Sequence, residues 1–164
     1  MYILVGGVME ELTVALFGHR EIDDIRSLED RLYPLAEEII RNSSYTTFLI
    51  GRNGEFDICA ASVIKRVQRR TGNENSELIC VFPYLRRDME YYEKYYDGIL
   101  LPECTEKAHY KSAITKRNQW MVERADLIIC YVERSDGGAY AALRYARVLK
   151  KKLINLTEKQ AEDE

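Results

Sequence analysis

Short apolar runs rich in β-branched residues alternate with longer amphipathic stretches along most of this 164-residue chain. Parallel strands cannot be joined by a hairpin, so each needs a crossover, which is usually a helix. Near-continuous apolar runs such as "DLIIC" indicate strands that are buried on both faces. The alternation therefore predicts an α/β fold, a three-layer Rossmann-like domain with a mainly parallel sheet. The predicted strands are Thr13–His19, Thr46–Arg52, Glu77–Leu85, Gly98–Glu103, Asp126–Glu133 and Lys152–Leu156.

The stretches between these runs have helical periodicity or helix-start signals. Asp23 or Asp24 can cap a helix that runs to about residue 41, with its apolar residues on one face. The other predicted helices are residues 57–70, a short tyrosine-rich helix ended by Gly98, residues 107–124, and a last helix that begins at a double glycine. A chain of this length buries enough surface for one core. We therefore expect one domain over residues 1–156 and a disordered acidic tail over residues 157–164.

Charge and cysteine usage limit the classes of partner. The formal net charge of -3 gives no electrostatic reason to expect nucleic acid or an anionic membrane, so we expect neither as a partner. The four cysteines form no close pair, so we expect no metal site and no disulfide framework. Acidic residues interrupt the apolar N-terminal stretch and no basic region precedes it, so neither a signal peptide nor a membrane span fits. These features predict a cytoplasmic protein.

Polar and glycine residues that directly follow a predicted strand are the natural candidates for a site. In open α/β sheets, ligands bind at the carboxyl ends of the strands, where helix N-termini offer unpaired N–H groups to anions. Three clusters meet this condition and a fourth lies in the helix before the fifth strand. The clusters are Gly18–Arg20, Gly51–Asp57, Arg134–Gly138 and Thr115–Asp126.

The two adjacent glycines, Gly137 and Gly138, stand between a strand and the start of a helix. Glycines are costly to order, so a folded chain keeps them where a side chain would obstruct a ligand or a neighbouring backbone. Their position predicts a phosphate site at the helix N-terminus, and close helix-to-sheet packing is the alternative.

The other candidates each have a functional and a structural interpretation. Gly51, Gly54 and Asp57 can form part of a ligand site, or simply a tight turn followed by a helix cap, which is the commoner use. Arg20 and Arg117 can each hold a phosphate bidentately, or form a surface salt bridge. His19 can act as a general acid or base, although a histidine at a strand end more often hydrogen-bonds a neighbouring loop.

Four segments, taken in order, resemble the SLOG superfamily, which includes the SMF/DprA and LOG proteins, and within it the YpsA-like branch. The segments are "ALFGHR", "IGRNGEFDICAASVI", "ITKRNQWMVERADLIICYV" and "SDGGAYAALRYAR", and the match spans about residues 13–156. The resemblance implies a Rossmann-like fold, a tendency to form dimers or larger oligomers, and a pocket for a nucleotide or nucleotide-derived ligand. By motif position, the residues expected to line that pocket are Gly18, Arg20, Gly51, Gly54, Asp57, Arg117, Asn118, Gly137 and Gly138. His19 and Ser135, which lie in the same clusters, complete the set of expected ligand-binding residues.

The resemblance leaves three functions open. LOG-type enzymes are phosphoribohydrolases with a PGGxGTxxE signature, but here Tyr140 and Ala141 replace the Gly-Thr pair and no glutamate follows at the expected place. A hydrolase would need another carboxylate, such as Glu55, Asp57 or Asp136. We therefore expect a binding or sensing protein that needs no cofactor, rather than an enzyme. Single-stranded DNA binding, as in the DprA relatives, ranks last because the net charge is negative.

Overall fold

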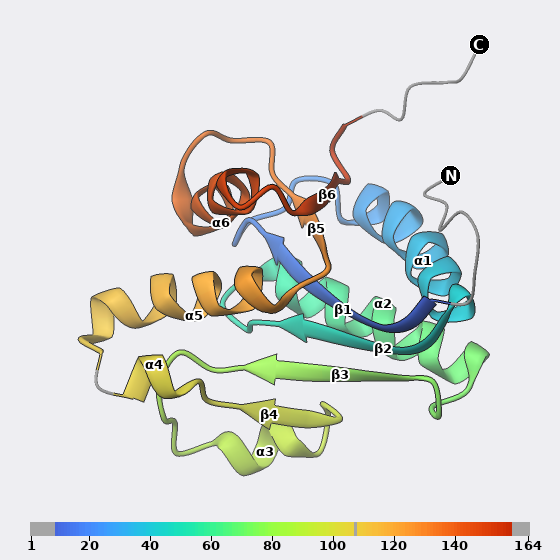
Figure 1. The fold of residues 1–164 in the computed structure, drawn as a ribbon, viewed down its shortest axis with the longest axis horizontal. Helices are drawn as coiled ribbons and strands as arrows, with labels where there is room; N and C mark the ends of the chain where they lie inside the picture. The colour runs from blue at the N-terminus through green and yellow to red at the C-terminus, as the bar shows by residue number, and fades with distance from the viewer. Residues whose placement is uncertain (1–8, 107, 159–164) are drawn as a thin grey trace.

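The computed structural model describes residues 9–106 and 108–158, which form a six-stranded sheet with helices on both faces (Figure 1). The strand order is β4-β3-β2-β1-β5-β6, and every neighbouring pair is parallel. The predicted three-layer α/β fold is confirmed. The strands are β1 (Met9–Gly18), β2 (Ser43–Ile50), β3 (Ser76–Val81), β4 (Gly98–Leu100), β5 (Leu127–Tyr131) and β6 (Lys152–Asn155). The helices are α1 (Ile25–Asn42), α2 (Glu55–Thr71), α3 (Met89–Glu93), α4 (Glu103–Glu106), α5 (Tyr110–Arg124) and α6 (Gly137–Val148).

The sheet separates two hydrophobic cores, because successive side chains of a strand point to opposite faces. In β1, Val14 and Leu16 belong to the core beneath α1 and α2, whereas Ala15 and Phe17 belong to the core beneath α5 and α6. All four side chains are buried. A strand covered on both faces must be apolar throughout, which is the pattern that the sequence displays.

The order of the strands determines where the sheet opens. From β1 the chain moves outward through β2, β3 and β4, and then returns to the other side of β1 with β5 and β6. The segments that leave β1 and β5 therefore diverge to opposite faces of the sheet. Such a point of reversal creates a crevice beyond the carboxyl ends of the strands, where ligands bind in open α/β folds.

Several predicted boundaries move by a few residues. The side chain of Asp24 caps α1 by accepting a hydrogen bond from the Ser27 N–H at 2.9 Å, as predicted. In contrast, α2 begins at Glu55 with Gly54 as its N-cap, so Asp57 lies inside the helix and does not cap it. The tyrosine-rich helix α3 ends at Glu93, and Gly98 starts β4 instead of ending the helix.

The remaining differences follow from sheet pairing and from proline. β1 begins at Met9 because residues before Thr13 already pair with β2, where Met9 is aligned with Ser43. β3 ends at Val81, two residues before Pro83, which has no N–H to donate to the ladder. The predicted helix over residues 107–124 is α5 alone, which starts at Tyr110 and is preceded by the separate short helix α4.

Two expectations concern the ends of the chain. Most of the predicted disordered tail, residues 159–164, lies outside the described residues, as do residues 1–8 of the apolar N-terminal stretch. Over residues 9–106 and 108–158, no helix combines the length and the hydrophobicity that a membrane crossing requires.

Candidate functional site

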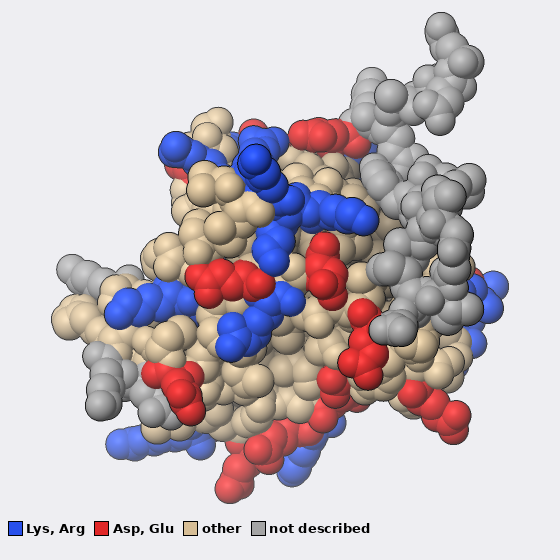
Figure 2. Space-filling view, in the orientation of Figure 1, with Lys and Arg blue, Asp and Glu red and all other residues tan. Residues whose placement is uncertain are grey.

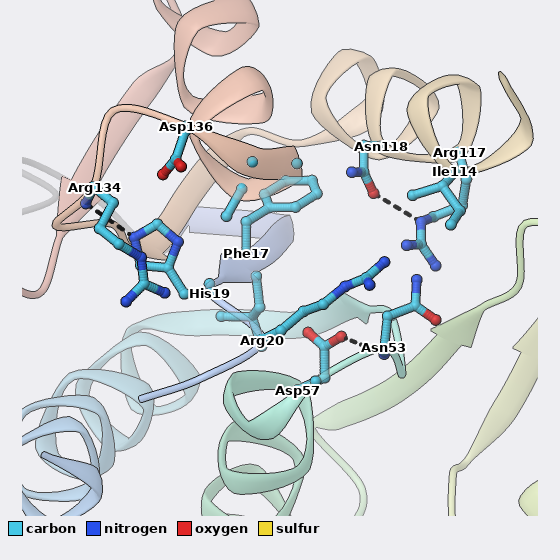
Figure 3. Close-up of a pocket in the computed structure, with 17 residues that line it drawn as sticks. Phe17, His19, Arg20, Asn53, Asp57, Ile114, Arg117, Asn118, Arg134 and Asp136 are labelled. Atoms are coloured by element: carbon cyan, nitrogen blue, oxygen red, sulfur yellow. Dashed lines mark hydrogen bonds between the residues drawn. The ribbon is translucent and has the colours of Figure 1, made fainter. Parts of the chain in front are cut away.

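A cavity of about 460 Å³ lies beyond the carboxyl ends of β1, β2 and β5, at the reversal of the strand order (Figure 3). The structure brings the predicted site residues together here, with the exception of Ser135, which is exposed and does not line the cavity. The predicted residues in the lining are Gly18, His19, Arg20, Gly51, Gly54, Asp57, Arg117, Asn118, Gly137 and Gly138.

Three of the glycines in the lining make room for protein atoms. A Cβ on Gly18 would collide with the ring of Phe56, and one on Gly54 with the backbone of Arg20. A Cβ on Gly51 would lie 2.9 Å from Nη1 of Arg117. These glycines therefore let α2, the β1 loop and the Arg117 side chain approach one another closely.

The double glycine at the start of α6 differs from these three. A Cβ on Gly137 would meet nothing within 4 Å, and one on Gly138 would meet only Nδ2 of Asn118, at 3.7 Å. Gly137 also has a φ of +85°, a backbone conformation that favours glycine over any other residue. The first turn of α6 thus faces open space, with its N–H groups in the positive field of the helix N-terminus.

Arg117 is a buried cation at the wall of this cavity. Its side chain is only 4% exposed. Nη1 donates to the carbonyl oxygen of Val81 at 2.8 Å, and Nε donates to Oδ1 of Asn118 at 2.8 Å. Burial lowers the pKa of the guanidinium, and the charge of Asp57 opposes that effect. No carboxylate of the described residues forms an ion pair with it.

Arg20 supplies a second positive charge from the opposite side. Figure 3 shows its side chain extending across the floor of the cavity, so that its guanidinium lies towards Asn53 and Arg117. Within the described part of the chain, Arg20 has no ion-pair partner either. Two arginine side chains that converge without an ion-pair partner form a site suited to a bound anion.

Asp57 is a carboxylate that interacts electrostatically with both arginines. Its Oδ2 accepts a hydrogen bond from the Asn53 N–H at 2.8 Å, and its side chain points towards the cavity from the first turns of α2 (Figure 3). Burial raises the pKa of Asp57, while the Asn53 N–H and then Arg117 and Arg20 act to lower it. The carboxylate thus reduces the positive potential of the cavity.

His19 has the structural role that the sequence favoured. Its Nε2 accepts hydrogen bonds from the backbone N–H groups of Glu133 and Arg134, at 3.0 and 3.1 Å. These bonds require an unprotonated Nε2. Burial lowers the pKa of His19, as does Arg134, whereas Glu133 and Asp136 raise it. His19 therefore holds the loop that leads from β5 to the double glycine.

The carboxylates that could replace the missing LOG-type glutamate lie in different environments. Glu55 is occupied elsewhere, because its Oε2 accepts a hydrogen bond from the Ile22 N–H at 2.7 Å. Asp57 and Asp136 both line the cavity. Over the described ranges, no three metal-ligating side chains are close enough together to hold an ion.

Phe17 and Ile114 also line the cavity, and no sequence pattern marked them as site residues. Asn53, Arg134 and Asp136 line it too, and they lie inside two of the predicted clusters without having been singled out as ligand-binding residues. The sequence pattern indicates a core position in a buried strand for Phe17. It indicates an apolar position in a helix for Ile114. Only the packing of α5 against the end of the sheet brings Ile114 to the cavity.

The fold has counterparts among solved structures. No family model matches the sequence, and no curated protein does. The structure is similar to DNA processing protein A (DprA) from Streptococcus pneumoniae, with 12% identity and a TM-score of 0.65 over 93% of this chain and 52% of that one. It is also similar to DprA from Helicobacter pylori, with 20% identity and a TM-score of 0.64 over 93% of this chain and 67% of that one. The chain thus spans about half of the first relative and two thirds of the second.

These similarities correct one expectation and support another. The H. pylori structure is described for its single-stranded DNA binding mode, so the fold is one that binds nucleic acid in another protein. The expectation that nucleic acid is not a partner was therefore wrong, because a small net negative charge says little about one local surface. The likeness to DprA agrees with the Rossmann-like fold that the SLOG resemblance implied. The more specific YpsA-like assignment stays a prediction.

Proposed function

We propose that this protein binds a nucleotide or nucleotide-derived ligand, with a phosphate of the ligand in the cavity between Arg117, Arg20 and the start of α6. The buried guanidinium of Arg117 is the observation that carries this proposal. A buried charge is costly unless a counter-charge compensates it. Asp57 acts on Arg117 electrostatically, but no carboxylate of the described residues lies within ion-pair distance of its guanidinium. A bound phosphate would supply that counter-charge and would accept hydrogen bonds from both Arg117 and Arg20.

The helix N-terminus and the size of the cavity agree with this ligand. Gly137 and Gly138 leave space beside the N–H groups of the first turn of α6, where a phosphate is stabilised by the helix field. The volume of about 460 Å³ lies in the usual range for small-molecule sites, about 300–1,000 Å³. A reaction on the ligand is not required by any of these features, so we propose binding or sensing.

A direct test compares the thermal stabilisation of the protein by AMP, NAD, ADP-ribose, cyclic AMP and inorganic phosphate. We expect at least one nucleotide to raise the melting temperature, with its concentration dependence giving the affinity. The Arg20→Gln variant should lose this stabilisation, and Arg124→Gln should keep it. Arg124 is a matched control, because it lies on α5 with its guanidinium 4.1 Å from the centre of the Trp120 ring and outside the cavity lining. Stabilisation that is equal in all three proteins would contradict the proposal.

Chromatography of the ligand after incubation separates binding from catalysis. An unchanged nucleotide is expected of a binding protein. Release of a free base would instead favour the phosphoribohydrolase alternative, with Asp57 or Asp136 as the carboxylate that lies in the cavity lining.

Single-stranded DNA binding is the second candidate, and the fold likeness to the two DprA structures is the observation that favours it. In this case the cavity would hold one phosphate of a strand. The face in Figure 2 bears Lys and Arg side chains interleaved with Asp and Glu, and no continuous basic stripe crosses it. Binding of oligothymidylate that weakens steeply with salt would favour this candidate over a mononucleotide.

A further inference from the structure

Tyr84 and Tyr110 form a stacked pair at the end of the sheet that contains the cavity. Tyr84 follows β3 and Tyr110 is the first residue of α5. Their ring centroids are 4.8 Å apart, the planes are inclined by 35°, and the Tyr84 hydroxyl donates to the Tyr110 hydroxyl at 3.4 Å. Each ring therefore restricts the orientation of the other.

The pair is continuous with the cavity along one face of α5. Residues that are three or four positions apart are neighbours on a helix surface, so Tyr110, Ile114 and Asn118 form one stripe, with Arg117 beside it. Ile114, Arg117 and Asn118 all line the cavity. At 1.5 Å per residue, Tyr110 lies about 10 Å along the helix from Arg117. This separation is comparable with the reach of a nucleotide from its phosphate to the outer edge of its base.

The two rings differ in exposure. Tyr110 is 64% exposed, whereas Tyr84 is half-buried. One ring of the pair is thus anchored and the other presents a face to solvent. The hydrogen bond to Tyr110 raises the pKa of Tyr84, whereas the charges of Arg86 and of Arg117, a residue of the cavity lining, act to lower it.

We propose that the exposed face of Tyr110, held in place by Tyr84, is a stacking subsite for a nucleobase. This inference depends on the proposed function, in which the phosphate of the same ligand lies beside Arg117. Aromatic side chains bind bases of any identity through their π-faces, and a ring that is already oriented loses little freedom on binding. The base can belong to a mononucleotide or to a nucleotide in a single strand, since both present the same face.

The other exposed tyrosines, Tyr91 and Tyr95, do not lie on a helix that lines the cavity. They belong to α3 and the residues that follow it, a segment that also contains Glu90, Glu93 and Asp97. Figure 2 shows acidic side chains along the lower edge of the molecule, where α3 and β4 lie, with Lys and Arg side chains among them. Neither tyrosine lies on α5, the helix that carries Ile114, Arg117 and Asn118 of the cavity lining. Tyr91 is therefore a matched control for Tyr110: it is 69% exposed and also contacts a second tyrosine, Tyr92.

Isothermal titration calorimetry with AMP and ribose 5-phosphate tests the subsite. The wild-type protein should bind AMP about tenfold more tightly than ribose 5-phosphate, because only AMP carries a base to stack. The Tyr110→Leu variant should lose this difference while its affinity for ribose 5-phosphate stays the same. Tyr110→Phe, which keeps the aromatic face, and Tyr91→Leu should both behave as the wild type.

The same variants with a short oligothymidylate and its abasic counterpart identify the source of the base. If the wild type prefers the base-containing strand, and Tyr110→Leu abolishes this preference without changing the affinity for AMP, the subsite is assigned to a base of a single strand. If the wild type binds the base-containing and base-free probes equally, the subsite is wrong and the phosphate site stands. If neither these four probes nor NAD, ADP-ribose or cyclic AMP bind, the proposed function is wrong and the subsite is wrong with it.

Discussion

The guanidinium of Arg117 occupies the space in which a side chain on residue 51 would lie, with Nη1 at 2.9 Å from the position of a Cβ on Gly51. The same Nη1 donates to the Val81 carbonyl oxygen. Gly51, which follows β2, therefore allows Arg117 of α5 to place its guanidinium at the carboxyl ends of β2 and β3. Sheet and helix together hold the cation that we propose binds the phosphate.

Gly51→Ala should weaken ligand binding and the fold together. The added methyl group forces the Arg117 guanidinium away from Val81, which disturbs a buried hydrogen bond. We expect the free energy of unfolding to fall by about 1–3 kcal/mol, the usual cost of overpacking a core. Urea denaturation measures this loss. A variant as stable as the wild type, with unchanged AMP affinity, would show that the contact has no such role.

Gly138→Ala should have the opposite combination of effects. The added methyl group meets only Nδ2 of Asn118 at an ordinary contact distance, and alanine is the better helix former. We expect the free energy of unfolding to rise by roughly 0.5–1 kcal/mol, and the affinity for AMP to fall because the methyl group occupies the proposed phosphate space. Thermal unfolding with and without AMP measures both quantities. An unchanged affinity would exclude a phosphate at this helix N-terminus.

Arg117→Met should separate binding from stability. Removing a buried charge that forms no ion pair relieves a desolvation cost, whereas losing the hydrogen bond to the Val81 carbonyl oxygen costs about 1–3 kcal/mol. Because the two effects oppose each other, we expect only a small net change in the free energy of unfolding. Loss of a buried charge partner should reduce the affinity for AMP by at least about 30-fold. Calorimetry and urea denaturation provide the two values. Equal losses of stability and affinity would make Arg117 a structural residue.

Asp57→Asn should strengthen the binding of an anion. The carboxylate interacts electrostatically with Arg117 and Arg20 and so reduces their attraction for a phosphate. Removing one charge near the ligand is worth about 1 kcal/mol in a solvated site, or roughly fivefold in affinity for inorganic phosphate. Asparagine can still accept the hydrogen bond from the Asn53 N–H. Weaker phosphate binding by this variant would mean that Asp57 contacts the ligand favourably, as a donor or through water.

Stability and ligand affinity should fall together in mildly acidic solution because of His19. The folded protein lowers the pKa of His19 below its ordinary value of 6.5, so the unfolded chain binds more protons in the interval below 6.5. The stabilisation is therefore complete above pH 6.5 and is lost as the pH falls through the lower folded value. Protonation removes the acceptor for the Glu133 and Arg134 N–H groups, which releases the loop before Gly137.

Measurements of unfolding free energy and AMP affinity between about pH 8 and about pH 5 check this behaviour. Arg134, Glu133 and Asp136 are the charged groups that act on His19, so the profile should also shift in the Arg134→Gln variant. His19→Asn offers an uncharged acceptor at every pH and should flatten the profile. A wild-type profile identical to that of His19→Asn would show that this histidine does not control the loop.

Much of the fold could be predicted from the sequence because its signals are local. The alternation of apolar runs and amphipathic stretches specified a parallel sheet, and Asp24 capped its helix as expected. The rule that ligands gather at strand ends selected Gly18–Arg20, Gly51, Gly54, Asp57, Gly137 and Gly138, which all line the cavity, and also Ser135, which does not. It did not select Phe17 or Ile114. Boundaries were less certain. Met9 joins β1 only because Ser43 of β2 pairs with it, which no local pattern reveals.

The sequence by itself determined which residues come near the carboxyl ends of the strands, because that depends on periodicity and chain direction alone. Only the tertiary structure decided what each of them does there. Gly51 and Gly54 accommodate Arg117 and Arg20, whereas Gly137 and Gly138 face open space, and four glycines look the same in a sequence. The different roles of these glycines depend on contacts between segments that are far apart in the chain. The identity of a residue does not reveal which distant residues pack against it.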